Sequence, residues 1–303
     1  MFNPFYEKIE ADENDLTLIN RIRDGGSEDL EKLIFRHQAW IFNIVMKMTM
    51  DMGEAEDITQ EILIKMVTKL STFDSEKGTF RTWLYRIVAN HVINMKKSKY
   101  ESIFQSIQEF ESLIANMSDE KSEISPETNL MLEELKIKCW SGIILCLNRK
   151  HRLVFILGEI FDVKDALGSQ IMDISKSNYR KILSRSRKKI YNFMRQKCGL
   201  INKKNPCHCE YKIKGLTQKG FIKPDNMQHF QEKAKKIKDV VLEIIDDANQ
   251  HGCSEHIQIF KNHPFYDPPG FNTWIFTLFK NGKLAKVPIG RNKCKLLEKG
   301  EMI

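Results

Sequence analysis

Hydrophobic side chains recur every three or four residues over most of the first two hundred positions of the chain. This spacing is that of one face of an α-helix, and short breaks such as Gly25-Gly26 and Asp51-Met52-Gly53 divide it into segments. Ser27 stands where a side chain would cap the second segment. We predict four helices here, over residues 16–22, 27–48, 54–70 and 79–97. Helices of this length close an all-α domain, which we assign to residues 1–97.

A second set of helices follows a polar segment. Residues 98–129 are rich in Ser, Asp and Glu with only a weak apolar repeat, so we interpret them as an acidic linker that is helical in part. The apolar spacing then returns, and a short helix ending near Met172 is followed by the turn Asp173-Ile174 and a longer helix over residues 176–197. Two helices across a tight turn are typical of a helix-turn-helix, so we assign residues 130–197 to such a domain.

The last hundred residues change in character. Residues 198–209 form a cysteine-bearing knuckle, residues 215–224 have the composition of a linker, and residues 225–252 have the apolar spacing of a helix. The apolar run 274–279 is typical of a strand, following a loop rich in proline. We therefore predict an all-α fold of two helical domains, with a small C-terminal α or α+β extension over residues 198–303.

Charge divides the chain into two unlike halves. Its 303 residues carry 48 Lys and Arg against 40 Asp and Glu, a net charge of +8. Residues 1–134 hold 15 basic and 25 acidic side chains, whereas residues 135–303 hold 33 and 15. A charge that served solubility alone would be less polarised, so the basic half is a candidate for binding nucleic acid.

The sequence gives no indication of a membrane or secreted protein. No window approaches the roughly 18 consecutive apolar residues of a membrane span, and the acidic start lacks the cationic and apolar parts of a signal peptide. Seven cysteines, an odd number, favour free thiols in a reducing compartment over a disulfide framework. We expect a cytoplasmic protein without membrane insertion.

The helix over residues 176–197 is densely cationic. Its apolar side chains can face inward, which leaves a polar and basic surface made of Arg180, Lys181, Ser184, Arg185, Arg187 and Lys188. Such a helix fits the major groove of DNA, where its cations reach base edges or phosphates. An ordinary solvated basic helix is the alternative, and the short helix and turn before it favour DNA.

Two further motifs lie in the acidic half. Residues 55–61, AEDITQE, are most simply a helix start whose carboxylates complement the helix dipole. Residues 79–90, TFRTWLYRIVAN, interleave aromatic and Arg side chains beside a polar loop, which suits the stacking of unpaired bases. Alternatively, the aromatic side chains of this second motif belong to the core and its arginines to an ordinary surface. Neither motif alone therefore indicates a function.

In order along the chain, AEDITQEILIKM, TFRTWLYRIVANHVI and the helix-turn-helix with LSRSRKKI resemble the sigma-70 family of bacterial RNA polymerase initiation factors, and more narrowly its compact extracytoplasmic-function (ECF) type. The resemblance covers about residues 15–197. It implies that the core RNA polymerase binds to the first motif, with the coiled coil of its β′ subunit on Asp57, Gln60 and Glu61. The acidic charge of the N-terminal half then fits a surface for binding protein.

The same resemblance implies the DNA-binding residues. The loop 71–78 and the helix after it would open the −10 promoter element and hold a flipped base, through Phe73, Tyr85 and Asn90. The basic helix would read the −35 element through Arg180, Lys181, Ser184 and Arg185. The chain departs from the family at Leu167-Gly168-Ser169, where a Glu-Ile-Ala triplet is usual, and at Ile182, where a basic residue is frequent.

The cysteines after this helix are a candidate metal site. Thiolates and imidazole are zinc ligands, and a turn at Asn205-Pro206 would bring Cys207, His208 and Cys209 back toward Cys198. The spacing is not a standard zinc-finger pattern, so Cys198, Cys207 and Cys209 are candidate zinc ligands, with packed reduced thiols or a redox-sensitive pair as alternatives. More distant candidates for a missing ligand are Cys253, His256 and Cys294.

Enzyme classes find little support. The chain lacks a glycine-rich phosphate loop, a His-Glu-x-x-His motif and a nucleophile elbow, so we infer no catalytic activity and no required cofactor. The leading interpretation is a transcription initiation factor whose partners are the β and β′ subunits of core RNA polymerase and promoter DNA, with an anti-sigma factor as a candidate partner of the extension. The alternatives are a polymerase-independent helix-turn-helix regulator with a metal- or redox-sensing tail and a zinc-dependent nucleic-acid enzyme.

Overall fold

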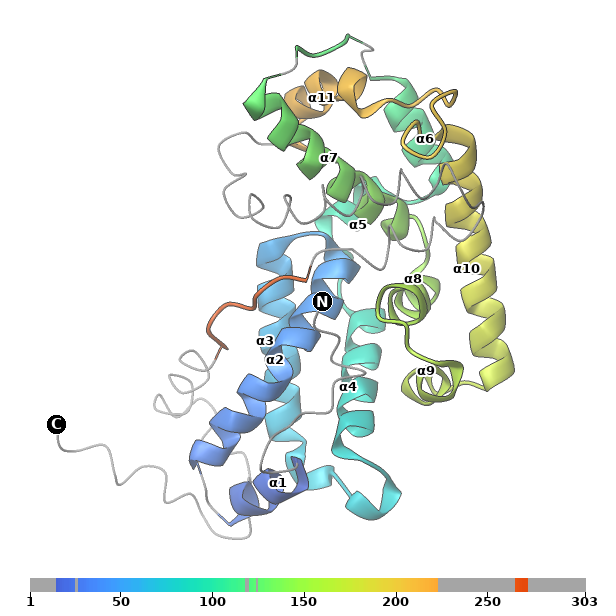
Figure 1. The fold of residues 1–303 in the computed structure, drawn as a ribbon. Helices are drawn as coiled ribbons and strands as arrows, with labels where there is room; N and C mark the ends of the chain where they lie inside the picture. Colours follow the sequence, from blue (N-terminus) through green and yellow to red (C-terminus); the bar gives the residue numbers. More distant parts are fainter. Residues whose placement is uncertain (1–14, 25–26, 118–119, 124, 223–264, 272–303) are drawn as a thin grey trace, which may run out of the picture.

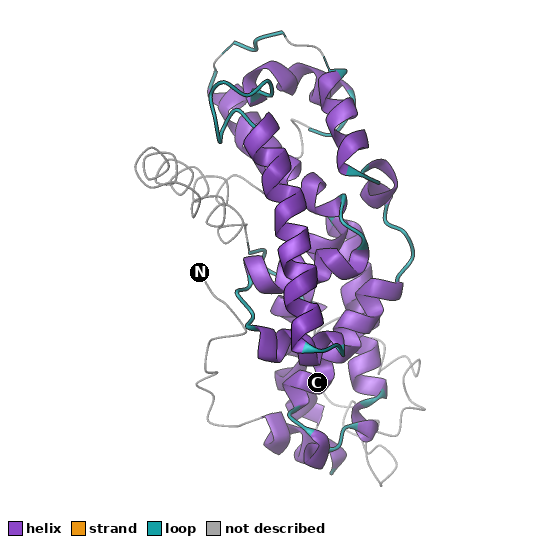
Figure 2. Cartoon of the chain, turned by 90° about the vertical axis from the view of Figure 1, so that its right-hand side faces the viewer, coloured by secondary structure: helices purple, strands orange, loops and turns teal. Residues whose placement is uncertain are grey.

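The computed structural model describes residues 15–24, 27–117, 120–123, 125–222 and 265–271. Within these residues every regular element is helical except for one isolated β-bridge, so the all-α prediction is confirmed (Figure 2). None of the described helices is both long and apolar enough to cross a membrane. The helix expected over residues 225–252 and the apolar run 274–279 lie outside the described residues.

The N-terminal helices form the lower bundle in Figure 1. The helices are α1 (Asp15–Arg23), α2 (Ser27–Thr49), α3 (Met52–Thr68) and α4 (Phe80–Asn94). Two short 3-10 turns, η1 (Leu70–Thr72) and η2 (Ser75–Lys77), join α3 to α4. The start of α3 is fixed by Asp51, whose carboxylate accepts the Glu54 N–H at 3.0 Å. Thr79 caps α4 in the same way, accepting the Thr82 N–H at 3.3 Å.

The acidic linker contains two short helices, α5 (Lys99–Ile103) and α6 (Ile107–Ala115). Ser98 and Glu101 form a capping box at the start of α5, and Ser106 caps α6. These polar residues at helix starts explain why a segment with a weak apolar repeat is nevertheless helical in part.

The C-terminal group of helices consists of α7 (Pro126–Leu145), α8 (Arg149–Phe155) with one π-helical turn η3 (Ile156–Ile160), α9 (Asp165–Met172) and α10 (Lys176–Lys197). The helices expected on either side of the turn at residue 173 are both present. Asp173 adopts the left-handed conformation with φ of 50° and ends α9. Ser175 then caps α10 by accepting the Asn178 N–H at 3.2 Å.

The two groups of helices pack against each other and share one hydrophobic core. At one contact α4 lies against α9, and the Arg86 Nε–H donates to the carbonyl oxygen of Gln170 at 3.0 Å. At another contact the buried Arg152 of α8 donates to the carbonyl oxygen of Met48 at 2.9 Å. Helices α4 and α9 are therefore held side by side.

One expectation about the end of the second group is wrong. A helix, α11 (Cys209–Gln218), occupies part of the predicted linker 215–224. Gly215 is buried inside this helix, and Leu216 and Ile222 pack with Met117 and Leu135 in a small second core. The glycines and polar residues between 215 and 220 suggested a linker, but the apolar residues among them are held by contacts with α7.

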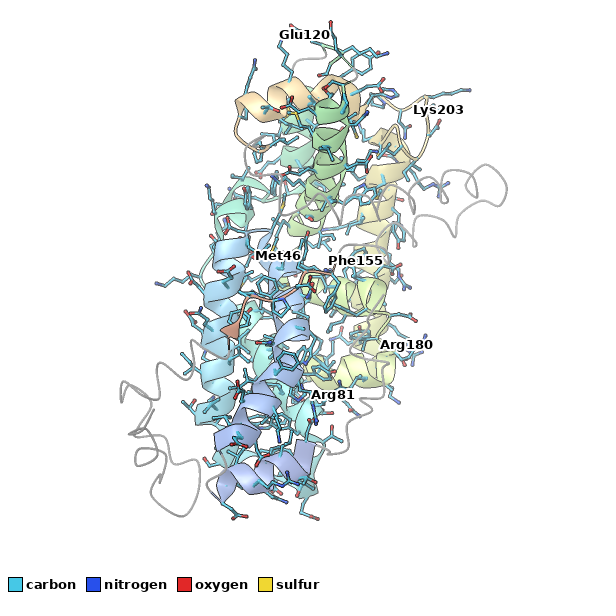
Figure 3. The ribbon with its side chains drawn as sticks, turned by 60° about the vertical axis from the view of Figure 1, so that its left-hand side comes forward. Met46, Arg81, Glu120, Phe155, Arg180 and Lys203 are labelled. Carbon is cyan, nitrogen blue, oxygen red and sulfur yellow. The ribbon has the colours of Figure 1, made fainter. Side chains whose placement is uncertain are left out.

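A short part of the extension returns to the N-terminal bundle. Residues 265–271 lie beside α2 near the labelled Met46 (Figure 3), with Tyr266 and Phe271 buried. The rings of Phe42 and Phe271 are 6.1 Å apart between centroids. The described parts of the extension thus contact the helical groups at two places: α11 packs against α7, and residues 265–271 pack against α2.

Candidate nucleic-acid interface

Helix α10 presents one polar face and buries the other. Its inward side chains include Tyr179, Ile182 and Ile190, as the apolar spacing predicts. All four residues expected to read the −35 element are exposed: Arg180, Lys181, Ser184 and Arg185. Arg180 forms an ion pair with Asp165 of α9 at 2.8 Å, and because the arginine is largely exposed this pair contributes roughly 0–1 kcal/mol. The face is therefore available to a phosphate or a base edge.

Arg187 differs from its basic neighbours. Its guanidinium is paired with Glu159 of η3, a fully buried carboxylate that also accepts the Tyr191 hydroxyl at 2.6 Å. Burial of the Tyr191 ring and the neighbouring Glu159 carboxylate both raise the pKa of Tyr191. Arg187 is thus partly exposed on the expected surface, but its guanidinium also fastens α10 to η3.

The departure from the family pattern at Gly168 has a steric reason. Tyr179 of α10 lies against α9, and a Cβ built on Gly168 would come within 2.3 Å of the tyrosine ring carbon Cζ. Real Cβ atoms do not approach other atoms so closely, so only glycine leaves room for this ring. The pair fixes how α9 and α10 cross, and therefore how the exposed face of α10 is presented.

The three residues expected to bind the polymerase lie on α3. Asp57 and Glu61 are exposed and Gln60 is half-buried, and their spacing places them on neighbouring positions of one helix surface. Glu61 also contacts the buried His91 of α4, with 3.3 Å between Oε2 and Nε2. Burial and the nearby Lys65 lower the pKa of His91, which therefore stays neutral near pH 7. The surface is acidic, and the helix that carries it packs against α2 and α4.

The three residues expected to bind −10 DNA are not gathered in one open pocket. Phe73 is 5% exposed and lies 5.4 and 5.8 Å from the rings of Phe80 and Trp83. Tyr85 is 3% exposed and packs edge-on against Trp40 at 4.6 Å, and burial raises its pKa to about 12. Asn90 is exposed, five residues along α4 from Tyr85 and hence on another side of the helix.

A residue that sequence reasoning missed holds the loop before α4. The Arg23 guanidinium at the end of α1 donates to the carbonyl oxygen of Phe73 at 2.7 Å and to that of Leu70 at 3.4 Å. These bonds tie the loop to the bundle while its polar side chains remain exposed. A basic residue in the last turn of a helix is common, so the sequence carries no signal for this role.

The cysteine knuckle closes as expected. Cys198 and Cys207 form a parallel β-bridge, in which Cys207 N–H donates to Lys197 O at 3.0 Å and Gly199 N–H donates to Cys207 O at 2.8 Å. A Cβ on Gly199 would come within 2.8 Å of that carbonyl oxygen, so the close approach requires glycine. The turn at Asn205 helps, because its amide donates to the carbonyl oxygen of Cys198 at 2.9 Å.

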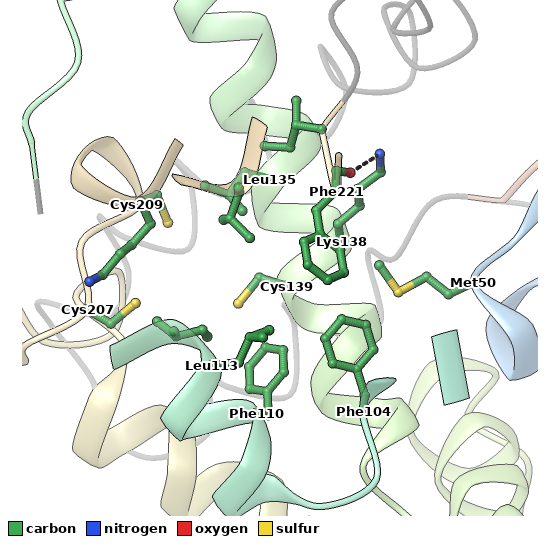
Figure 4. Close-up of a pocket in the computed structure, with 14 residues that line it drawn as sticks. Met50, Phe104, Phe110, Leu113, Leu135, Lys138, Cys139, Cys207, Cys209 and Phe221 are labelled. Atoms are coloured by element: carbon green, nitrogen blue, oxygen red, sulfur yellow. Dashed lines mark hydrogen bonds between the residues drawn. The ribbon is translucent and has the colours of Figure 1, made fainter. Parts of the chain in front are cut away.

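A further thiol, Cys139 of α7, joins this cluster and was missed as part of an apolar stripe. The thiols of Cys139, Cys207 and Cys209 point into one small apolar space lined by Phe104 and Phe110 (Figure 4). Burial, with the neighbouring thiols, raises the pKa of Cys139 well above its usual range and that of Cys209 to about 12. In the described part of the chain no three His, Cys, Asp or Glu side chains are arranged to hold a metal ion, so zinc at Cys198, Cys207 and Cys209 is unsupported.

Comparison with known proteins supports the resemblance of the N-terminal bundle to the sigma-70 family. Residues 33–101 match the family described as Sigma-70 region 2. The chain is 33% identical over 82 residues to the RNA polymerase sigma-H factor of Pseudomonas aeruginosa, a match that covers 27% of this chain and 42% of that protein. The chain thus spans less than half of that relative.

Two other relatives are matched over more of their length. A probable RNA polymerase sigma factor of Haemophilus influenzae is 26% identical over 152 residues, which cover 47% of this chain and 78% of the relative. The ECF RNA polymerase sigma factor SigW of Bacillus subtilis is 24% identical over 179 residues, which cover 58% of this chain and 95% of the relative. The chain thus contains a sigma-70 region 2 over residues 33–101, and over about half of its length it is similar to sigma factors of the ECF type.

Proposed function

We propose that this protein is a transcription initiation factor that binds core RNA polymerase and directs it to promoters. The observation that carries the proposal is the presence, in one chain, of a sigma-70 region 2 over residues 33–101 and a helix-turn-helix whose second helix, α10, has an exposed cationic face. The protein itself has a regulatory role and needs no cofactor, while the polymerase synthesises the RNA. It would act in the cytoplasm, where polymerase and DNA are found.

The polymerase would bind to the acidic surface of α3. Asp57 and Glu61 project from its exposed side, with Gln60 between them. A partner surface rich in Arg and Lys would pair with these carboxylates, which favours rapid association more than it increases affinity. Helix α3 is capped by Asp51 and packed on α2 and α4, and these contacts would keep the surface in place before the partner arrives.

The −10 element would be read at the loop 71–78 and α4. In the free protein Phe73 and Tyr85 are buried, so a flipped base could reach Phe73 only after the loop moves away from Trp83, and Tyr85 only after its contact with Trp40 opens. Asn90 needs no such movement because it is exposed. We propose that the loop opens when DNA or polymerase binds, and that aromatic stacking with the base then replaces the contact between Phe73 and Trp83.

The −35 element would be read by α10 in the major groove. Arg180, Lys181, Ser184 and Arg185 lie toward the N-terminal half of this helix, which is the part that contacts bases in a helix-turn-helix. Ser184 can donate or accept a hydrogen bond, and the three cations can contact guanine edges or phosphates.

Binding of purified core polymerase tests the assignment. We expect Asp57→Ala with Gln60→Ala to weaken binding of the core enzyme and to leave binding of duplex DNA unchanged. Arg185→Ala should do the reverse, and Glu31→Ala, an exposed carboxylate on α2, serves as the matched control. If wild-type protein captures no β or β′ subunit but still binds DNA, a polymerase-independent regulator is the better description.

A further inference from the structure

The segment 265–271, which we call the clasp segment, is bound to α2 by a paired set of hydrogen bonds. The side-chain amide of Asn43 donates to the carbonyl oxygen of Tyr266 at 2.8 Å, and the Tyr266 N–H donates to the Asn43 Oδ1 at 2.7 Å. Both residues are buried. A buried asparagine that satisfies both polar groups of one distant peptide unit is a specific docking contact, because either group alone would be costly to leave unpaired.

The side chains of the clasp segment add apolar contact. Tyr266 and Phe271 are 3% and 1% exposed, and Phe271 packs against Phe42 of α2. Phe42 belongs to an apolar stripe on α2 that continues through Ala39 to Phe35, whose side chain is exposed. The clasp segment thus packs on one end of a stripe whose other end, at Phe35, is exposed.

Lys47 connects the clasp segment with the C-terminal group of helices. Its Nζ lies 5.6 Å from the centroid of the Tyr266 ring and 5.7 Å from that of Phe161, which follows η3. Lys47 is itself almost fully buried on α2, where a cation near two aromatic rings is favoured. Burial and the carboxylate of Glu134 on α7 also raise the pKa of Tyr266. The ring of Tyr266 therefore lies where the N-terminal bundle meets the C-terminal group.

The arrangement that this segment holds cannot serve both promoter elements at once. Elements at −10 and −35 are about 25 base pairs apart, which is about 85 Å at 3.4 Å per base pair. In the structure α4 and α9 are in contact, through Arg86 and Gln170, and α10 with its 22 residues is only about 33 Å long. The two groups of helices must separate before both can bind one promoter.

We propose that the clasp segment is an internal regulatory element that docks on α2 and keeps the protein in this closed form. The inference rests on the proposed function, and it adds that the extension lowers transcription until the clasp segment is released. The occupant of the α2 surface in the inactive protein is thus the chain's own residues 265–271. Core polymerase, which requires the open form, would compete with the clasp segment.

Release of the clasp segment can be tested in the full-length chain. We expect Tyr266→Ala with Phe271→Ala to increase the radius of gyration in solution scattering and to raise transcription by core polymerase. If the open form is about a tenth of the wild-type population, the increase is at most about tenfold. Gly270→Ala is the matched control, because a Cβ there meets no atom within 4 Å and both readouts should stay at the wild-type value.

A second variant distinguishes opening of the molecule from misfolding of the first variant. Lys47→Met keeps an unbranched side chain of similar length and removes the cation, so it should open the molecule partly without changing the helical content measured by circular dichroism. An unchanged radius of gyration in both variants refutes the clasp, whatever transcription does. A larger radius without increased transcription refutes the inhibitory role, whereas absence of core binding in every form, wild type included, refutes the proposed function instead.

Discussion

At the scale of single residues, Gly168 and Tyr179 determine how the helix-turn-helix packs. An aromatic ring from α10 occupies the space that any side chain at residue 168 would need. Helix propensity alone would favour Ala at this position by about 1 kcal/mol, so sequence statistics and packing make opposite predictions here. Packing should prevail because both residues are buried.

Gly168→Ala should therefore destabilise the protein by about 1–3 kcal/mol through overpacking. The thermal unfolding midpoint measures this directly. Gly53→Ala is a control of the same chemistry at an exposed position of α3, where the new Cβ would lie 3.5 Å from the nearest atom. An equal or higher midpoint for Gly168→Ala would contradict the proposed packing.

His37 is a buried neutral imidazole in the core of the N-terminal bundle. The Trp40 indole donates to its Nδ1 at 3.1 Å, so the ring proton is on Nε2, which lies 3.2 Å from Asp15 Oδ1. Burial lowers the pKa of His37, although Asp15 opposes the shift. Burial tends to raise the pKa of Asp15, but His37 and Arg36 outweigh it and lower the value to about 2.

We expect stability to fall as the pH decreases below the ordinary histidine value of 6.5. The pKa values of His37 and His91 are lower in the folded state than in the unfolded chain. Below pH 6.5 the unfolded chain therefore binds more protons than the folded protein and is favoured. The contribution of Asp15 is lost only at lower pH, from 3.8 toward 2. Urea unfolding at pH 7.5 and 5.0 measures the first effect, and a protein equally stable at both would contradict it.

At the scale of elements, α10 has two kinds of cation. Arg185 is exposed, whereas Arg187 compensates the buried Glu159. We therefore expect Arg185 to act in DNA binding and Arg187 in folding.

Replacement by alanine should separate these roles. Arg185→Ala should leave stability unchanged and reduce by about one the slope of log affinity for duplex DNA against log salt concentration. Arg187→Ala should cost about 1–3 kcal/mol of stability, because a buried carboxylate loses its cation. Fluorescence anisotropy and urea unfolding give the two readouts, with the exposed Lys121→Ala as control; a stable Arg187→Ala protein that binds DNA weakly would reverse the assignment.

The sequence predicts most helices because their apolar spacing is regular, and α10 has the predicted bounds, residues 176–197. It does not predict α11, whose apolar residues are few and are held by α7. Nor does it predict the burial of Phe73, the partner of Arg187 or the position of Cys139. These depend on contacts between segments far apart in the chain, which periodicity along one helix cannot report.

At the scale of the whole molecule, the acidic and basic halves meet in a buried network. Glu101 of the acidic linker pairs with Arg149 at 2.8 Å and with Arg152 at 3.0 Å. Arg152 also donates to the carbonyl oxygens of Leu145 and Met48. Burial tends to raise the pKa of Glu101, but the two arginines outweigh it and lower the value.

Glu101→Ala should destabilise the protein by about 3 kcal/mol, because Arg152 would remain buried without its carboxylate. The effect should be present above pH 4.5, the ordinary value of this carboxyl, and should disappear as the pH falls through its lower folded-state pKa. Chemical unfolding measures it, with the exposed Glu123→Ala as control. A loss of stability equal to that of the control would mean that the network contributes little.

Reconstituted transcription is the measurement that tests the central claim most directly. Purified protein and core RNA polymerase would be incubated with a library of promoters that vary at −10 and −35, and the 5′ ends of the transcripts would be sequenced. We predict initiation at a defined subset of the library that depends on both elements, and loss of those transcripts with Asp57→Ala and Gln60→Ala. Transcripts that are the same with and without the protein, for wild type and for the opened Tyr266→Ala and Phe271→Ala form alike, would contradict the assignment as an initiation factor.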